Sequence, residues 1–153
     1  MKNITQAPDL FLDTSALFAG IWSESGASRQ LLKLGELGLI TIVLSAQVLS
    51  EIDYALRLKA PQTMGMLAVL LDRAQVRITP TSLPRLFQQA RMVVSHPGDA
   101  RVIADAWDAK VDFFVTLDRQ HLLSNEPLIQ MLPFPVGTPG DALAWYRERF
   151  LSP

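Results

Sequence analysis

The chain has 153 residues, no cysteine and only two histidines, His96 and His121. The absence of cysteine excludes a disulfide framework and a thiolate metal site, and so few histidines argue against zinc chemistry of the usual kind. The sequence also has no apolar run as long as a membrane span, and residues 1–8 lack the hydrophobic stretch of a signal peptide. We therefore expect a cytoplasmic protein with no membrane partner.

An excess of basic charge is missing as well. The 14 lysine and arginine residues are balanced by 15 acidic residues, which gives a net charge of −1. The chain thus has no overall basic surface for nucleic acid, although metal ions or a partner protein can supply positive potential locally. Hydrophobic residues make up 49% of the chain, which is typical of a compact globular protein. We expect one domain over residues 1–153.

Apolar segments typical of strands alternate along the chain with segments of helical periodicity. The strands lack a regular polar alternation, which indicates burial on both faces and hence parallel pairing. This order predicts a three-layer α/β/α fold, in which helices flank a central, mainly parallel sheet. The expected strands are Asp9–Asp13, Ile40–Leu44, Val76–Thr79, Val111–Leu117 and, more weakly, Pro127–Leu132. The expected helices are Thr14–Ile21, Ser25–Leu37, Ser45–Lys59, Pro61–Arg73, Ser82–Ser95, Asp99–Lys110 and Pro139–Phe150.

Four carboxylates, those of Asp13, Glu51, Asp99 and Asp118, interrupt this apolar pattern. Asp13 and Asp118 each close a hydrophobic strand, and ligands of open α/β sheets bind beyond the carboxyl ends of the strands. An ionised carboxylate against a core is costly unless a positive charge compensates it. A divalent ion held by oxygen ligands compensates several carboxylates at once. The pattern therefore favours a phosphodiester-cleaving site that depends on Mg²⁺ or Mn²⁺.

Helical periodicity separates the inward-facing acids from the solvated ones. Glu51 lies at the edge of the apolar arc of its helix, whereas Asp53 points well away from that arc. Asp99 coincides with the middle of the apolar stripe of its own helix. Asp105 lies on the flank of the same stripe, so we expect it to be a reserve ligand.

Each acid also has an ordinary explanation. Asp13 and Asp99 are suitable helix caps, and Asp118 is suited to the start of a turn. Glu51 can be an exposed helix residue that pairs with a base. Capping is the better explanation for either aspartate taken alone, but the placement of all four acids at one edge favours the metal site.

The residues beside these acids are candidates for supporting roles. Hydroxyl groups of Thr14, Ser15 and Thr116 can position a metal-bound water or a phosphate oxygen, or they can cap helices. Arg119 and His121 follow Asp118 and are candidates for contact with substrate phosphate, although exposed basic residues are more often solvated surface.

One pair of helices is more apolar than a single buried face requires. The helices Ser45–Lys59 and Pro61–Arg73 are rich in leucine and methionine. Such surfaces pair with a second copy of the chain or accept a partner helix. We expect a homodimer, a protein partner, or both.

Four sequence blocks, in this order and at this spacing, resemble the PIN-domain family of small metal-dependent ribonucleases, which includes VapC-like toxins of toxin–antitoxin modules. The blocks are Leu12-Asp13-Thr14-Ser15, Ser50-Glu51-Ile52, Gly98 to Ala106, and Val115-Thr116-Leu117-Asp118. The resemblance covers nearly the whole chain. It implies a PIN-like fold, an RNA substrate, and a cognate antitoxin as partner.

Residue by residue, the resemblance implies that Asp13, Glu51, Asp99 and Asp118 are the four catalytic acids. Of these, the three aspartates would hold the metal. Many family members carry a further acidic or amide residue shortly after the fourth acid, whereas this chain has Arg119-Gln120-His121.

Three other interpretations remain open. A catalytically silent PIN-like module would bind RNA or protein without metal-dependent turnover. A phosphatase of the haloacid-dehalogenase type needs a second aspartate two residues after the first, where this chain has Ser15. A purely structural α/β domain would show no coupling between metal and stability.

Overall fold

The sheet has five strands, all parallel, in the order β3-β2-β1-β4-β5. The structure is a computed structural model that describes residues 6–151. The strands are β1 (Asp9–Leu12), β2 (Thr41–Ser45), β3 (Arg77–Thr79), β4 (Phe113–Val115) and β5 (Val136–Gly137). The first strand lies in the centre, and its neighbours β2 and β4 come from distant parts of the chain. The predicted parallel α/β architecture is therefore confirmed.

The central strands carry the core. All four residues of β1 and all three of β4 are buried, as expected for strands covered on both faces. Phe11 and Phe114 stack across this strand pair with their ring centroids 5.4 Å apart. The two residues are partners in the register of β1 and β4, which sets the positions of the residues that follow each strand.

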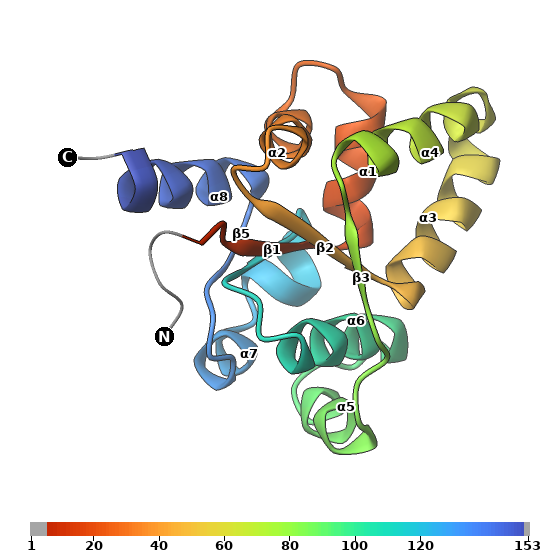
Figure 1. The fold of residues 1–153 in the computed structure, drawn as a ribbon. Helices are drawn as coiled ribbons and strands as arrows, with labels where there is room; N and C mark the ends of the chain where they lie inside the picture. Colours follow the sequence, from red (N-terminus) through yellow and green to blue (C-terminus); the bar gives the residue numbers. More distant parts are fainter. Residues whose placement is uncertain (1–5, 152–153) are drawn as a thin grey trace.

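Helices cover both faces of the sheet (Figure 1). In the figure, α1, α2 and α8 lie on one side, α5, α6 and α7 lie on the other, and α3 and α4 form a hairpin at one flank. The helices are α1 (Thr14–Trp22), α2 (Ala27–Glu36), α3 (Ala46–Lys59), α4 (Met64–Arg73), α5 (Pro84–Arg91), α6 (Pro97–Asp108), α7 (Glu126–Met131) and α8 (Pro139–Tyr146). Short helical turns η1 (Pro61–Thr63), η2 (Arg119–Leu123) and η3 (Arg147–Leu151) complete the described chain.

The predicted strand Pro127–Leu132 is wrong, because this segment forms helix α7. Asn125 caps the helix by accepting a hydrogen bond from the amide of Leu128 at 3.1 Å. Pro127 stands in the first turn, where its missing N–H is not needed. These start signals outweigh the apolar run that suggested a strand. The fifth strand is instead β5, which has only two residues.

Helix α6 also begins earlier than predicted. Its N-cap is His96, whose side chain accepts from the amide of Asp99 at 3.4 Å. Asp99 therefore lies within the first turn and is not the cap. This leaves its carboxylate available to the site described below.

Two expectations concern membranes and secretion. Between residues 6 and 151, no helix is long and apolar enough to cross a membrane. The expected lack of a signal peptide rests on residues 1–8, of which 1–5 lie outside the described part of the chain.

Candidate active site

Asp13 stands at the junction of β1 and α1 and caps the helix. Its Oδ1 accepts from the amide of Ala16 at 2.9 Å and from the hydroxyl of Ser15 at 2.6 Å, and its Oδ2 accepts from the hydroxyl of Thr116. The residue is 7% exposed. Burial raises the pKa of Asp13 to about 6, and the negative charge of Asp118 adds to the rise, although the three hydrogen bonds oppose it.

Thr116 joins the ends of the two central strands. Its hydroxyl donates to Asp13 and accepts from the amide of Asp118 at 3.0 Å. The strands pair up to this point, since the amide of Asp13 donates to the carbonyl of Val115 at 3.0 Å. The parallel pairing of β1 with β4 thus brings the first and fourth predicted acids to one edge of the sheet.

Glu51 reaches the same place from α3. Its carboxylate accepts from the hydroxyl of Thr14 at 2.6 Å and from the side-chain amide of Gln47 at 2.8 Å. Asp53, two residues later, pairs instead with Arg57 at 2.9 Å on the outer surface. The helical periodicity therefore separated the inward-leaning acid from the solvated one correctly.

Asp99 enters the site from the first turn of α6. Partial burial raises the pKa of Asp99, and the carboxylates of Asp118 and Glu51 raise it further. The imidazoles of His96 and His121 lower it. The net rise reflects burial first and the neighbouring carboxylates second, so the chain does not fully compensate the negative charge of Asp99.

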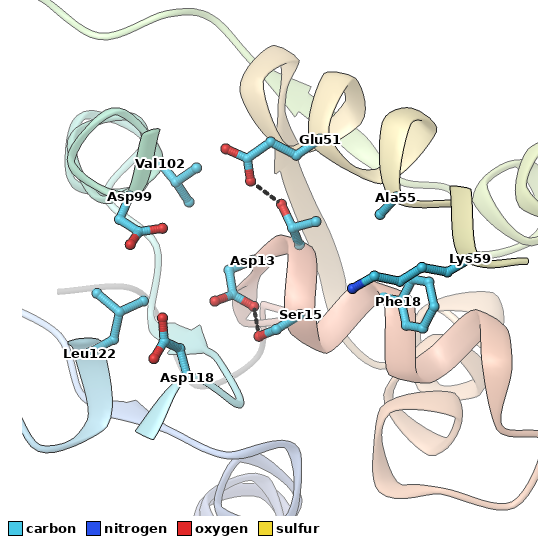
Figure 2. Close-up of a pocket in the computed structure, with 11 residues that line it drawn as sticks. Asp13, Ser15, Phe18, Glu51, Ala55, Lys59, Asp99, Val102, Asp118 and Leu122 are labelled. Atoms are coloured by element: carbon cyan, nitrogen blue, oxygen red, sulfur yellow. Dashed lines mark hydrogen bonds between the residues drawn. The ribbon is translucent and has the colours of Figure 1, made fainter. Parts of the chain in front are cut away.

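These four carboxylates line one pocket with a volume of about 380 Å³. Figure 2 shows the four side chains entering it from different elements, with Val102 and Leu122 on one side and Phe18 on the other. Among the described residues that line it, Lys59 is the one basic side chain, and its ammonium lies 5.9 Å from the ring centroid of Phe18. The pocket is therefore both acidic and partly apolar.

Three side chains can offer ligand atoms to one metal ion: Asp99 and Asp118 line the pocket, and His121 lines a separate cavity with His96. Single ligand atoms of Asp99, Asp118 and His121 all lie within 4.8 Å of one another. Asp13 lines the pocket but does not belong to this group, and both its oxygens accept hydrogen bonds from protein donors. Two carboxylates and an imidazole form a donor set that fits a divalent cation.

Besides His121 and Thr116, two predicted residues do not line the pocket. Asp105 is 1% exposed and its carboxylate accepts from the amide of Ser82 at 2.7 Å, so the structure places the expected reserve ligand outside the pocket. Arg119 lines a different cavity of about 310 Å³ between Leu117 and the start of α8. The structure therefore separates Arg119 from His121, which the sequence treated as a pair.

The sequence did not separate Lys59 from three other basic helix residues that could line an RNA path, and it did not single out Phe18, although both line the pocket. A signal for both exists in the helical spacing. Lys59 lies eight residues after Glu51, and Phe18 lies four residues after Thr14, so each shares a helix face with a residue that had been singled out.

Comparison with known proteins gives one family match. A family model described as PIN domain matches residues 9–120. No match was found among proteins with curated descriptions.

Solved structures show the same fold. A chain of VapBC2 from Rickettsia felis, solved bound to a DNA fragment from their promoter, superposes with a TM-score of 0.64 at 18% identity, covering 84% of this chain and 98% of that one. PAE2754 from Pyrobaculum aerophilum superposes with a TM-score of 0.60 at 14% identity, covering 92% of this chain and 90% of that one. A chain of FitAB, solved bound to the IR36 DNA fragment, superposes with a TM-score of 0.57 at 18% identity, covering 85% of this chain and 94% of that one. At sequence identities this low, the superpositions show that the fold is shared.

Proposed function

Because this chain belongs to the PIN-domain family, we propose that it is a divalent-metal-dependent endoribonuclease that hydrolyses RNA phosphodiester bonds. The observation that carries the proposal is the convergence of Asp13, Glu51, Asp99 and Asp118 on one pocket from separate elements. Carboxylates gathered at one pocket repel one another, and the charges of Asp118 and Glu51 add to the rise that burial gives the pKa of Asp99. A bound cation relieves that repulsion.

Each acid has a distinct part in this proposal. Asp99 and Asp118 would hold Mg²⁺ or Mn²⁺, and Asp13, from the neighbouring strand, would complete the negative surface around it. Held there, the ion would supply an activated water and would neutralise charge on the phosphoryl oxygens. Glu51, held by Thr14 and Gln47, keeps a fixed orientation toward the same space and would orient the attacking water.

Lys59 would bind the substrate. Its ammonium is the one positive charge of the described chain at a pocket otherwise lined by carboxylates and apolar groups. A lysine there attracts a phosphate of the RNA backbone, which carries most of the affinity of nucleic acid for protein. The ammonium of Lys59 lies 5.9 Å from the ring centroid of Phe18, and this cation–π contact would help to hold it at the pocket.

The test is cleavage of a mixed RNA pool with Mn²⁺ or Mg²⁺. Wild type should cut only when metal is present, and Asp13→Asn and Asp118→Asn should each lower the rate by at least about a hundredfold. Asp53→Asn is the matched control, because this carboxylate pairs with Arg57 outside the pocket, and it should cut like wild type. Lys59→Gln should raise the RNA concentration needed for half-maximal rate and leave the saturated rate nearly unchanged.

Other outcomes identify the alternatives. Cleavage that persists in both pocket variants would mean a contaminant and would remove the site assignment. Metal binding without cleavage by any form would favour a silent PIN-like module that binds RNA or protein.

A protein partner, namely a cognate antitoxin, is also proposed. The fold is shared with VapBC2 and FitAB, which were solved with DNA. The chain leaves Tyr54 and Leu58 of α3 and Val69 of α4 exposed at 68%, 64% and 47%. This exposed apolar surface of α3 and α4 would be covered by a second copy of the chain, by the antitoxin, or by both.

The partner proposal predicts a change in assembly. Light scattering should give a dimer for the chain alone, and co-expression with the product of a short neighbouring reading frame should give a stable complex that inhibits cleavage. Leu58→Glu should weaken at least one of these assemblies. Met92→Glu is the control, because Met92 is 83% exposed at the end of α5 on another part of the molecule. A monomer that binds no such product would contradict the proposal.

A further inference from the structure

His121 lies against the fourth acid of the site. Helical turn η2 begins after Asp118, and the amide of Leu123 donates to the carbonyl of Asp118 at 2.9 Å, five residues back. This wide π-type turn returns His121 toward the aspartate that precedes it. The amide of His121 donates to Asp118 Oδ1 at 2.9 Å, and its ring Nδ1 lies 3.2 Å from Asp118 Oδ2.

The separation of the two side chains is a hydrogen-bond distance, and it also fits two neighbouring ligands of one metal ion. Octahedral ions with bonds of about 2.1 Å have adjacent ligand atoms roughly 3.0 Å apart. The separation between Nδ1 and Oδ2 is 3.2 Å. A carboxylate oxygen of Asp99 lies in the same group, within 4.8 Å of both.

We propose that His121 is the third protein ligand of the metal ion, beside Asp99 and Asp118, and that it makes the site prefer Mn²⁺ over Mg²⁺. The inference rests on the proposed function, which supplies the metal. Mg²⁺ is bound in proteins mainly by carboxylates, phosphates and water, whereas first-row transition-metal ions accept imidazole nitrogen. One nitrogen ligand among oxygens therefore shifts the choice of ion.

The other histidine provides a matched control. His96 is also near the site, with Nδ1 3.9 Å from an oxygen of Asp99, but its ring caps α6 and is 67% exposed. The full sequence has no third histidine. Any imidazole signal from bound metal must therefore come from one of these two residues.

The experiment is pulsed electron paramagnetic resonance of Mn²⁺ bound to the full chain, with calorimetric titration of Mn²⁺ and Mg²⁺. Wild type and His96→Gln should show coupling of Mn²⁺ to an imidazole nitrogen, and His121→Gln should lose it. The same change should weaken Mn²⁺ binding by at least about tenfold and Mg²⁺ binding far less. His121→Asp should bind both ions with no nitrogen coupling and a smaller preference for Mn²⁺.

The outcomes separate this inference from the proposed function. Wild type that binds Mn²⁺ without nitrogen coupling would overturn the assignment of His121, which would then only orient Asp118 through a hydrogen bond, and the nuclease proposal would stand. Coupling that disappears in His96→Gln and survives in His121→Gln would overturn it as well. Failure of wild type to bind Mn²⁺ at all would overturn both.

Discussion

Asp13 combines three tasks in one buried carboxylate. It caps α1, accepts hydrogen bonds from the hydroxyls of Ser15 and Thr116, and contributes negative charge to the pocket. Capping a helix and lining the pocket are thus not alternatives at this position, although the sequence presented capping and a site role so. The contribution to stability depends on whether the group is charged.

The raised pKa of Asp13 predicts a specific dependence of stability on pH. The folded protein binds this proton with a pKa of about 6, against 3.8 for an ordinary aspartate. The native state therefore holds more protons than the unfolded state between these values, so the free energy of unfolding falls as pH rises through this window. The shift corresponds to a loss of up to about 3 kcal/mol by pH 7.

Asp13→Asn should abolish this pH-dependent part of the free energy of unfolding. It should keep the helix cap, because asparagine is as good an N-cap residue as aspartate. Urea unfolding of both proteins in a metal chelator, from pH 4 to 7.5, measures the difference. The variant should gain stability relative to wild type as pH rises, and most of the gain should lie between pH 4 and pH 6. Parallel curves for the two proteins would show that Asp13 carries no such cost.

At the scale of the element, the two-residue strand β5 supports the site by pairing with the end of β4. The amide of Thr116 donates to the carbonyl of Gly137 in β5 at 2.9 Å. A Cβ at Gly137 would lie 2.9 Å from Cβ of Asp141 and 3.0 Å from Cζ of Phe113. Only glycine therefore allows α8 to pack this closely against the strand that orders Thr116.

Gly137→Ala should destabilise the protein by about 1–3 kcal/mol through overpacking. Gly65→Ala is the control, because a Cβ at Gly65 in α4 meets nothing within 4 Å and alanine favours helix by roughly 0.5–1 kcal/mol. Urea unfolding at neutral pH compares the two. Equal stability of Gly137→Ala and wild type would mean that β5 and α8 shift freely.

The elements that sequence predicted well are those with strong local signals. The C-terminal helix opens with the capping box of Thr138 and Asp141, and proline follows the threonine. The signals failed where an element is short or depends on its neighbour. A two-residue strand such as β5 has no periodicity of its own and exists because β4 lies beside it.

At the scale of the whole molecule, the site is a product of strand order. The sequence could identify the four acids, because burial and helical phase mark each of them. It could not establish that β1 lies between β2 and β4, which is what places Asp13, Asp118 and the helix carrying Glu51 around one space. Nor could it show that the carboxylate of Asp105 accepts a hydrogen bond from the amide of Ser82, or that the ring of His121 contacts Asp118. Both facts depend on how the chain packs in three dimensions, which the local sequence pattern does not predict.

The central claim is that RNA hydrolysis requires a divalent ion held in the pocket of Asp99 and Asp118. The most direct measurement is the initial rate of RNA cleavage as a function of Mn²⁺ concentration, beside the calorimetric Kd for Mn²⁺ of the same preparation. For wild type, the rate should rise from zero in chelator and reach half its maximum in the concentration range of the Kd. Asp118→Asn should weaken binding and cleavage together. Cleavage in excess chelator, or an Asp118→Asn protein that cuts like wild type while binding less metal, would contradict the account.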